Sequence, residues 1–120
     1  MFQRGIRGAI TLDSNSVDEI KSNTVELLNA LVSSNHIETR DISHVIFTLT
    51  SDLTAAFPAK FARTELYWDD VPMVCFNELK VDGSIEMCMR VLIVVNTEKS
   101  QRDIRHIYLK GAKSLRPDLY

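Results

Sequence analysis

The stretch Met87–Val95 is apolar at every position except Arg90, and few folds can accommodate it. It is much shorter than the roughly 20 residues of a membrane-spanning helix. Because apolar side chains would point to both sides of an extended chain, residues 86–97 are predicted to form a strand buried on both faces. An arginine keeps its charge, so Arg90 must meet an anion. That anion is either a structural carboxylate or a bound ligand.

The rest of the chain alternates between strand and helix patterns. Residues 17–34 have apolar side chains three and four positions apart, and Ser16 with Glu19 makes a capping box at their start. The further predictions are strands at 2–12, 44–51, 71–76 and 104–109, a helix at 58–67 beginning at Pro58, a turn at Asp82-Gly83, and a helical turn at 110–115. This order predicts an α+β (mixed α/β) fold, with helices on one face of a mixed sheet.

Composition narrows the class of protein. The chain has 120 residues, 45% of them hydrophobic, and a formal net charge of −2. These values predict one soluble domain, residues 1–120, and argue against a nucleic-acid partner, which would need a basic face. No membrane segment or secretory signal is visible, and Cys75 and Cys88 form no disulfide framework. A reduced, cytoplasmic protein is therefore expected.

Arg7 repeats the pattern of Arg90. It lies between Ile6 and Gly8 in an otherwise apolar strand, and Gly5 and Gly8 would leave room for a ligand. Alone, Arg7 would be interpreted as a solvated arginine of an edge strand. The presence of two arginines in apolar strands favours a shared anion-binding site over two unrelated solvated arginines.

Further charged and polar residues extend this hypothesis. Additional cations, most of which would ordinarily be solvated, are Lys60, Arg63, Arg105 and Arg116. Lys60 and Arg63 are expected to share a helix face with Phe57 at the entrance to a pocket. Arg116 lies near the C-terminus, in a segment expected to close over a ligand.

Glu78 follows the strand at 71–76 and has three candidate roles: partner of Arg90, general base, or acceptor for a ligand hydroxyl. Cys75 has no histidine placed to activate it, so an inert thiol is predicted. No Cys or His pair has the spacing of a zinc site, and no phosphate-binding loop or serine nucleophile motif occurs. The candidate site therefore combines fixed cations with one carboxylate, one thiol and the Tyr108 phenol. This set of groups favours a small polyanionic ligand. It also favours a reaction that is catalysed by positioning and electrostatics.

Five separated segments resemble a known family along essentially the whole chain, in order and in spacing. They are Arg4–Ala9, Phe57–Arg63, Val71–Cys75 with Glu78, Arg90 in its apolar strand, and Ile104–Leu109 followed by Leu115–Leu119. The family is the monofunctional, trimeric bacterial chorismate mutases, of the small α/β-barrel-like class and not the all-helical class.

The resemblance implies an isomerase that converts chorismate to prephenate by a Claisen rearrangement, on the route to phenylalanine and tyrosine. It implies a pseudo-α/β-barrel homotrimer with sites at the subunit interfaces, and no cofactor or metal. Such an enzyme holds the chair-like conformer of a dicarboxylate. It also stabilises the negative charge that grows on the ether oxygen.

Site residues carry over by position. Arg90 would face the ether oxygen and a carboxylate, Arg7 and Tyr108 would bind carboxylate, and Glu78 and Cys75 would engage the ring hydroxyl region. The pocket would be lined by Phe57, Ala59, Lys60, Met73, Val74 and Leu115, with Arg63 and Arg116 near its mouth. Val74 departs from the hydroxyl residue often found there, so that contact is either made by the backbone or absent.

Two other functions remain open at this point. A non-catalytic trimeric domain that binds a small aromatic-pathway carboxylate would have the same cations, but it would need none at the ether oxygen. A small trimeric deaminase of similar architecture would need a group that activates water, and Glu78 is the one candidate. The position of Arg90 relative to the substrate separates the mutase from the binding domain.

Overall fold

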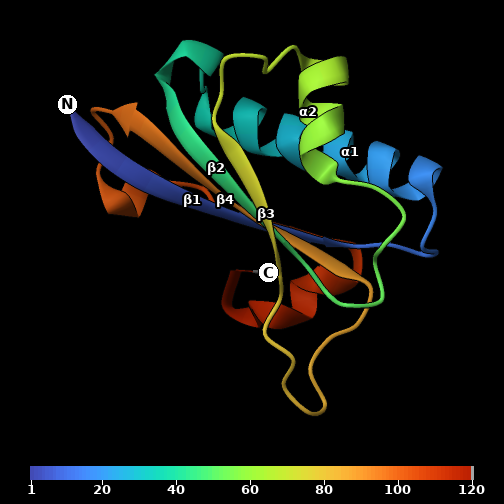
Figure 1. The fold of residues 1–120 in the computed structure, drawn as a ribbon. Helices are drawn as coiled ribbons and strands as arrows, with labels where there is room; N and C mark the ends of the chain where they lie inside the picture. Colours follow the sequence, from blue (N-terminus) through green and yellow to red (C-terminus); the bar gives the residue numbers. More distant parts are fainter. Residues whose placement is uncertain (120) are drawn as a thin grey trace.

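The computed structural model describes residues 1–119, so Tyr120, the last residue of the predicted domain, lies outside the described residues. The strands are β1 (Phe2–Thr11), β2 (Ile42–Leu49), β3 (Met73–Asn77), β4 (Cys88–Thr97) and β5 (Ile107–Leu109). The helices are α1 (Val17–Asn35) and α2 (Pro58–Leu66), and short 3-10 segments span Thr39–Asp41, Gln101–Asp103, Lys110–Leu115 and Pro117–Leu119. Both α-helices lie on the same side of one sheet (Figure 1).

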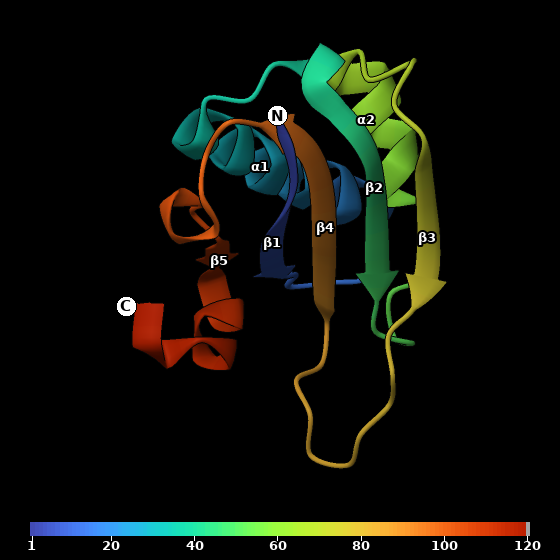
Figure 2. The ribbon, with the colours of Figure 1, turned by 90° about the vertical axis from the view of Figure 1, so that its left-hand side faces the viewer.

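The sheet has five strands in the order β3-β2-β4-β1-β5. The central strand β4 runs antiparallel to both β1 and β2, whereas β5 joins β1 and β3 joins β2 in parallel. Figure 2 shows the helices behind this sheet and its other face turned toward the viewer. The predicted α+β fold, a mixed sheet with helices on one face, is confirmed.

Helix α1 begins at the predicted cap, although only half of the capping box forms. The hydroxyl of Ser16 accepts a hydrogen bond from Glu19 N at 3.1 Å. The Glu19 carboxylate accepts from Asp13 N at 2.9 Å instead of from the backbone of Ser16. The helix ends at His36, which adopts the left-handed conformation with φ 52°. The two contacts of Glu19 and Ser16 therefore fasten the loop after β1 to the start of the helix.

Strand β4 is less buried than its sequence predicts. Its residues facing the helices, Met89, Val91, Ile93 and Val95, are all buried. On the opposite face, Arg90, Leu92 and Val94 are only half-buried. That face is covered at one end only, where Cys88 packs with Ala9, Tyr108 and Ala112. The expectation of burial on both sides is thus wrong for the single chain, because the helices pack on one face alone.

The last strand is shorter than predicted. Residues 104–109 were expected to be extended and paired, but β5 is limited to Ile107–Leu109. The backbone at Arg105 is bonded elsewhere: its N–H donates to Asn35 Oδ1 at 2.8 Å and its carbonyl accepts from Asn35 Nδ2 at 2.9 Å. A buried side chain at the end of α1 therefore replaces the strand ladder at this point.

Candidate active site

The register of the sheet aligns the residues of a candidate site across four strands. Arg90 of β4 lies opposite Thr48 of β2 and Ala9 of β1, and Ala9 lies opposite Tyr108 of β5. Because side chains alternate along strands, Thr48, Arg90 and Tyr108 project from the face without helices. They line a cavity of about 310 Å³ together with Arg7, Gly8, Ile46, Glu78, Val91 and Leu92.

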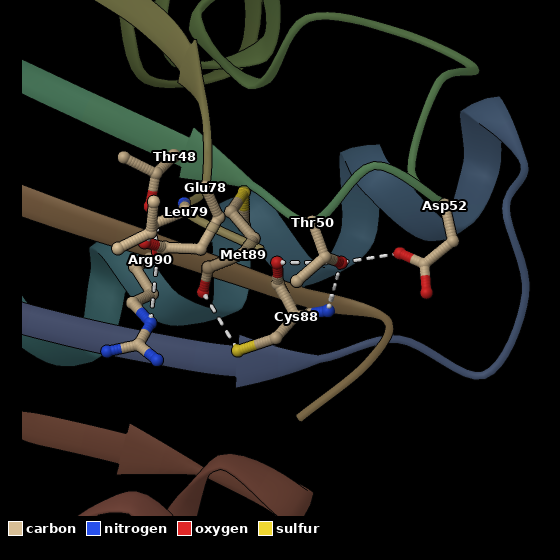
Figure 3. A network of polar contacts seen from close by, with 8 residues as sticks. All are labelled: Thr48, Thr50, Asp52, Glu78, Leu79, Cys88, Met89 and Arg90. Atoms are coloured by element: carbon tan, nitrogen blue, oxygen red, sulfur yellow. Dashed lines mark hydrogen bonds and ion pairs between the residues drawn. The ribbon is translucent and has the colours of Figure 1, made fainter. Parts of the chain in front are cut away.

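Glu78, the residue that follows β3, is the anion that Arg90 meets. Its Oε2 lies 3.1 Å from Arg90 Nε, and the same oxygen accepts a hydrogen bond from the Thr48 hydroxyl at 2.7 Å (Figure 3). Oε1 accepts from Leu79 N at 3.1 Å. The structural carboxylate considered for Arg90 is therefore present within the chain.

The Arg90–Glu78 pair is an ion pair rather than an aligned hydrogen bond. Among residues 1–119, Arg90 Nε has no hydrogen-bond partner of acceptable geometry, although its distance to Glu78 is short. Figure 3 shows the two terminal nitrogens of Arg90 pointing away from Glu78. Since 41% of the Arg90 side chain is exposed, the guanidinium can also reach a ligand.

Arg7 and Tyr108 lie beside this pair, close to the C-terminal segment. Arg7 N donates to His106 Nδ1 at 2.9 Å, which fixes the adjoining backbone. Burial, followed by the charges of Arg7 and Arg116, lowers the pKa of His106 below its usual value. Arg116 is held by Asp118 through two hydrogen bonds of 2.9 and 3.0 Å. The guanidinium of Arg116 in turn keeps the pKa of the Asp118 carboxyl below its usual range.

A second group of predicted residues lines a different cavity. Phe57, Lys60 and Cys75 border a space of about 470 Å³ beside the start of α2, and it shares no lining residue with the cavity around Arg90. Phe57 is 70% exposed and Arg63 is exposed on the next turn of α2. Within one chain, the predicted site residues that line these cavities are therefore divided between the two.

The other predicted lining residues are placed by packing. Ala59 is buried in α2, and Met73 packs against the core on the same side of β3 as Cys75. Val74 points to the other face and is 49% exposed. Leu115 packs against the small cluster that includes Tyr108.

Cys75 has the environment of a thiol and not of a thiolate. Burial raises its pKa, and the backbone of Ala59 and the charge of Arg63 only partly oppose this effect. Cys75 and Cys88 are both free cysteines.

A polar clamp joins the start of the loop between β2 and α2 to the start of β4. Asp52 Oδ2 accepts from Met87 N at 3.0 Å, and Oδ1 accepts from the Thr50 hydroxyl at 2.5 Å. Thr50 Oγ1 in turn accepts from Cys88 N at 3.0 Å (Figure 3). Met87 has φ 50°, an unfavourable conformation for a residue with a side chain. The clamp therefore holds a strained bend at Met87, three residues before Arg90.

The described residues form neither a metal-binding cluster nor a membrane-spanning helix. Among residues 1–119, no group of three or more His, Cys, Asp or Glu side chains is placed to hold a metal ion. In the same range, no helix has the length and apolar character needed to cross a bilayer.

Comparison with known proteins identifies the family. A family model described as chorismate mutase type I matches residues 3–119. The chain belongs to the type I chorismate mutase family. Chorismate mutase AroH of Bacillus subtilis is 40% identical over 119 residues, which cover 99% of this chain and 94% of that protein. The AroH chorismate mutase of Thermus thermophilus is 44% identical over 117 residues, or 97% of this chain and 95% of that protein.

A solved structure supports the same family assignment. A chorismate mutase from Clostridium thermocellum superimposes with a TM-score of 0.89 at 47% sequence identity, covering 92% of this chain and 97% of that chain. The predicted family is thereby confirmed. The chain is an enzyme, a chorismate mutase, so the alternative of a non-catalytic binding domain is excluded.

Thr48 is a residue of the cavity around Arg90 that the sequence analysis missed. It lies in a run of strand-forming residues, where a threonine is expected for its shape alone. The available signal was the alternation along β2, which puts Thr48 on the face opposite the buried Val45, Phe47 and Leu49. Its partner, Glu78, is 30 residues away and follows from the tertiary structure.

Proposed function

We propose that this mutase rearranges chorismate to prephenate in a site completed by two protomers of a homotrimer. The observation that supports a shared site is the division of the predicted residues between two open cavities. A small dicarboxylate must be enclosed to be held in one conformation, and neither cavity alone carries both sets of cations. A cyclic trimer would bring the α2 side of one chain to the Arg90 side of the next.

Exposed apolar residues next to the site support this assembly. Val74 and Phe76 on the open face of β3 are 49% and 56% exposed, and Phe57 is 70% exposed. Such side chains cluster on surfaces that contact other proteins. Burying the open sheet face between protomers would also provide the second covered face that the apolar residues of β4 predict.

In this site the reaction is a unimolecular exchange of bonds. The ether C–O bond of chorismate breaks while a C–C bond forms, no proton is transferred, and electron density accumulates on the ether oxygen. One terminal nitrogen of Arg90 would donate to that oxygen and the other to a carboxylate. Because the charge on the ether oxygen exists mainly in the transition state, this contact lowers the barrier rather than only strengthening binding.

The remaining residues would orient the substrate. Arg7 and Tyr108 bind a carboxylate, and Glu78 with Cys75 engages the ring hydroxyl region, with Cys75 as a weak neutral donor. The pocket wall would be formed by Phe57, Ala59, Lys60, Met73, Val74 and Leu115, with Arg63 and Arg116 at the mouth. Val74 has no side-chain donor, so any contact there belongs to the backbone.

The geometry of Glu78 argues against a water-activating role. Its carboxylate accepts from Thr48 and Leu79 and pairs with Arg90. A general base needs a free oxygen directed at the water it deprotonates. We therefore propose an orienting role for Glu78. We also propose that residues 1–120 form one chorismate mutase domain of a cytoplasmic enzyme of phenylalanine and tyrosine biosynthesis, which uses no cofactor or metal.

Mixing two inactive variants tests the shared site. Arg90→Ala removes one half of the site and the double change Lys60→Ala with Arg63→Ala removes the other. If the two halves come from neighbouring protomers, co-refolding equal amounts should restore chorismate consumption to about a quarter of wild type, since random mixing pairs intact halves in that fraction of interfaces. A trimer by light scattering with no regained activity would show that each site lies within one chain.

A further inference from the structure

The carboxylate of Glu78 is held by groups from three separate segments. Thr48 of β2 donates to Oε2 at 2.7 Å, Leu79 N donates to Oε1 at 3.1 Å, and Arg90 of β4 lies 3.1 Å from Oε2. Thr48 and Arg90 are register partners on neighbouring strands, so the sheet itself sets their separation. Thr48 is half-buried and lines the cavity around Arg90.

An unrestrained carboxylate beside an arginine would adopt a different arrangement. Arginine and carboxylate prefer two parallel hydrogen bonds, one of which uses a terminal nitrogen of the guanidinium. Here Glu78 approaches Nε alone, and that contact lacks hydrogen-bond alignment among the described residues. The terminal nitrogens point away from Glu78 (Figure 3). Another contact therefore holds the Glu78 carboxylate away from the terminal nitrogens. The shortest contact of this carboxylate is the hydrogen bond from the Thr48 hydroxyl, at 2.7 Å.

We propose that Thr48 is a positioning residue for the rearrangement. Its hydroxyl holds Glu78 to one side of Arg90, so that both terminal nitrogens of the guanidinium stay available to the substrate. Without this hydrogen bond, Glu78 turns toward Arg90 and takes a terminal nitrogen in a paired contact. The guanidinium then has one donor fewer for the ether oxygen or the carboxylate. This inference rests on the proposed roles of Arg90 and Glu78.

The variant that isolates the hydroxyl is Thr48→Val, because valine keeps the branched shape and strand preference of threonine. We expect kcat to fall about tenfold, the loss typical of one hydrogen bond to a charged group, with KM changed by less than about threefold. Thr48→Ser, which restores the hydroxyl, should recover most of the lost kcat. Thr24→Val is the matched control, since the buried Thr24 hydroxyl contacts Met89 Sδ on the opposite side of the sheet. It should leave kcat unchanged.

A double-mutant cycle separates positioning from other roles. In a Glu78→Ala background there is no carboxylate to hold, so Thr48→Val should have no further effect on kcat. A further tenfold loss in that background would mean that Thr48 contacts the substrate directly, and would overturn the proposal. Unchanged kcat in Thr48→Val, or a Thr48→Ser variant as impaired as Thr48→Val, would overturn it as well.

Failure of the site assignment would give a different result. If Glu78→Ala itself retained wild-type kcat, then Glu78 has no role in the reaction, and both the assigned site and the positioning role would be wrong. If Glu78→Ala is impaired while Thr48→Val is normal, only the positioning role is wrong. Thermal unfolding of each variant should show that all remain folded at the assay temperature.

Discussion

Replacement of Arg90 by lysine tests the mechanism most directly. The substitution keeps the positive charge but replaces five forked N–H donors with a single ammonium group. In the structure, Arg90 has Nε beside Glu78 Oε2 at 3.1 Å and its two terminal nitrogens directed elsewhere. A lysine has one nitrogen, so it cannot contact Glu78 and the substrate through separate donor atoms as arginine does. It will be drawn to Glu78, the nearest anion, and will leave the ether oxygen without a donor.

The magnitude follows from the number of donors lost. Removing one donor to a developing oxyanion typically lowers kcat by about 10²–10³, or roughly 2.7–4 kcal/mol. Arg90→Lys should therefore lower kcat by at least about 10², with a much smaller change in substrate binding, because the lost contact belongs mainly to the transition state. Stability should change little, since an ion pair this exposed contributes only about 0–1 kcal/mol.

The assay is steady-state consumption of chorismate by folded variants, followed by the loss of its absorbance. Arg40→Lys is the matched control, because Arg40 forms an exposed ion pair with Glu38 outside both cavities. That variant should keep wild-type kcat. A near-wild-type kcat in Arg90→Lys would refute the reasoning, and would assign Arg90 a structural role as the partner of Glu78.

Three further predictions follow from other parts of the structure. Cys75→Ser should retain most of kcat, because the raised pKa of Cys75 marks a neutral thiol; a complete loss, or a covalent adduct with substrate in mass spectrometry, would contradict this. The pKa of His106 is lowered in the native protein, so below about pH 6.5 the imidazole of the unfolded chain takes up a proton more readily than that of the folded chain. The free energy of unfolding should therefore fall as the pH is lowered below this value. Above it, His106 is neutral in both states and should not affect the pH dependence of stability. Urea unfolding at pH 5 and 7.5 measures this difference, which His106→Asn should reduce. Asp52→Ala should destabilise the protein by about 1–3 kcal/mol in urea unfolding, since the Met87 N–H loses its acceptor. The exposed Asp69→Ala is its control, and equal unfolding midpoints for the two variants would show that the clamp contributes nothing.

Local patterns were enough to predict the elements and the fold class. The spacing of apolar residues placed α1 within one residue, and Pro58 marked the start of α2. The apolar run around Arg90 identified the central strand β4. These signals are readable from sequence because they depend on the periodicity of a single element. The same local reasoning failed at Arg105, where a side chain from a distant helix replaced the strand ladder.

The charges of the site were also visible in the sequence, and their partners were not. An arginine within an apolar strand requires an anion wherever the chain folds, so Arg90 and the candidate Glu78 were found without a structure. Which oxygen Arg90 meets, and through which nitrogen, depends on the loop after β3 and on the pairing of β4 with β2.

Thr48 shows where the sequence stops being informative. It is 30 residues from Glu78 in the chain, and an unremarkable threonine until the sheet register sets it opposite Arg90. The division of the site residues between two cavities is of the same kind, since it depends on which face of the sheet the helices cover. Residue type and periodicity determined which groups carry the chemistry. Only the tertiary structure decided which of them meet, because register and packing are set by contacts between segments far apart in the chain.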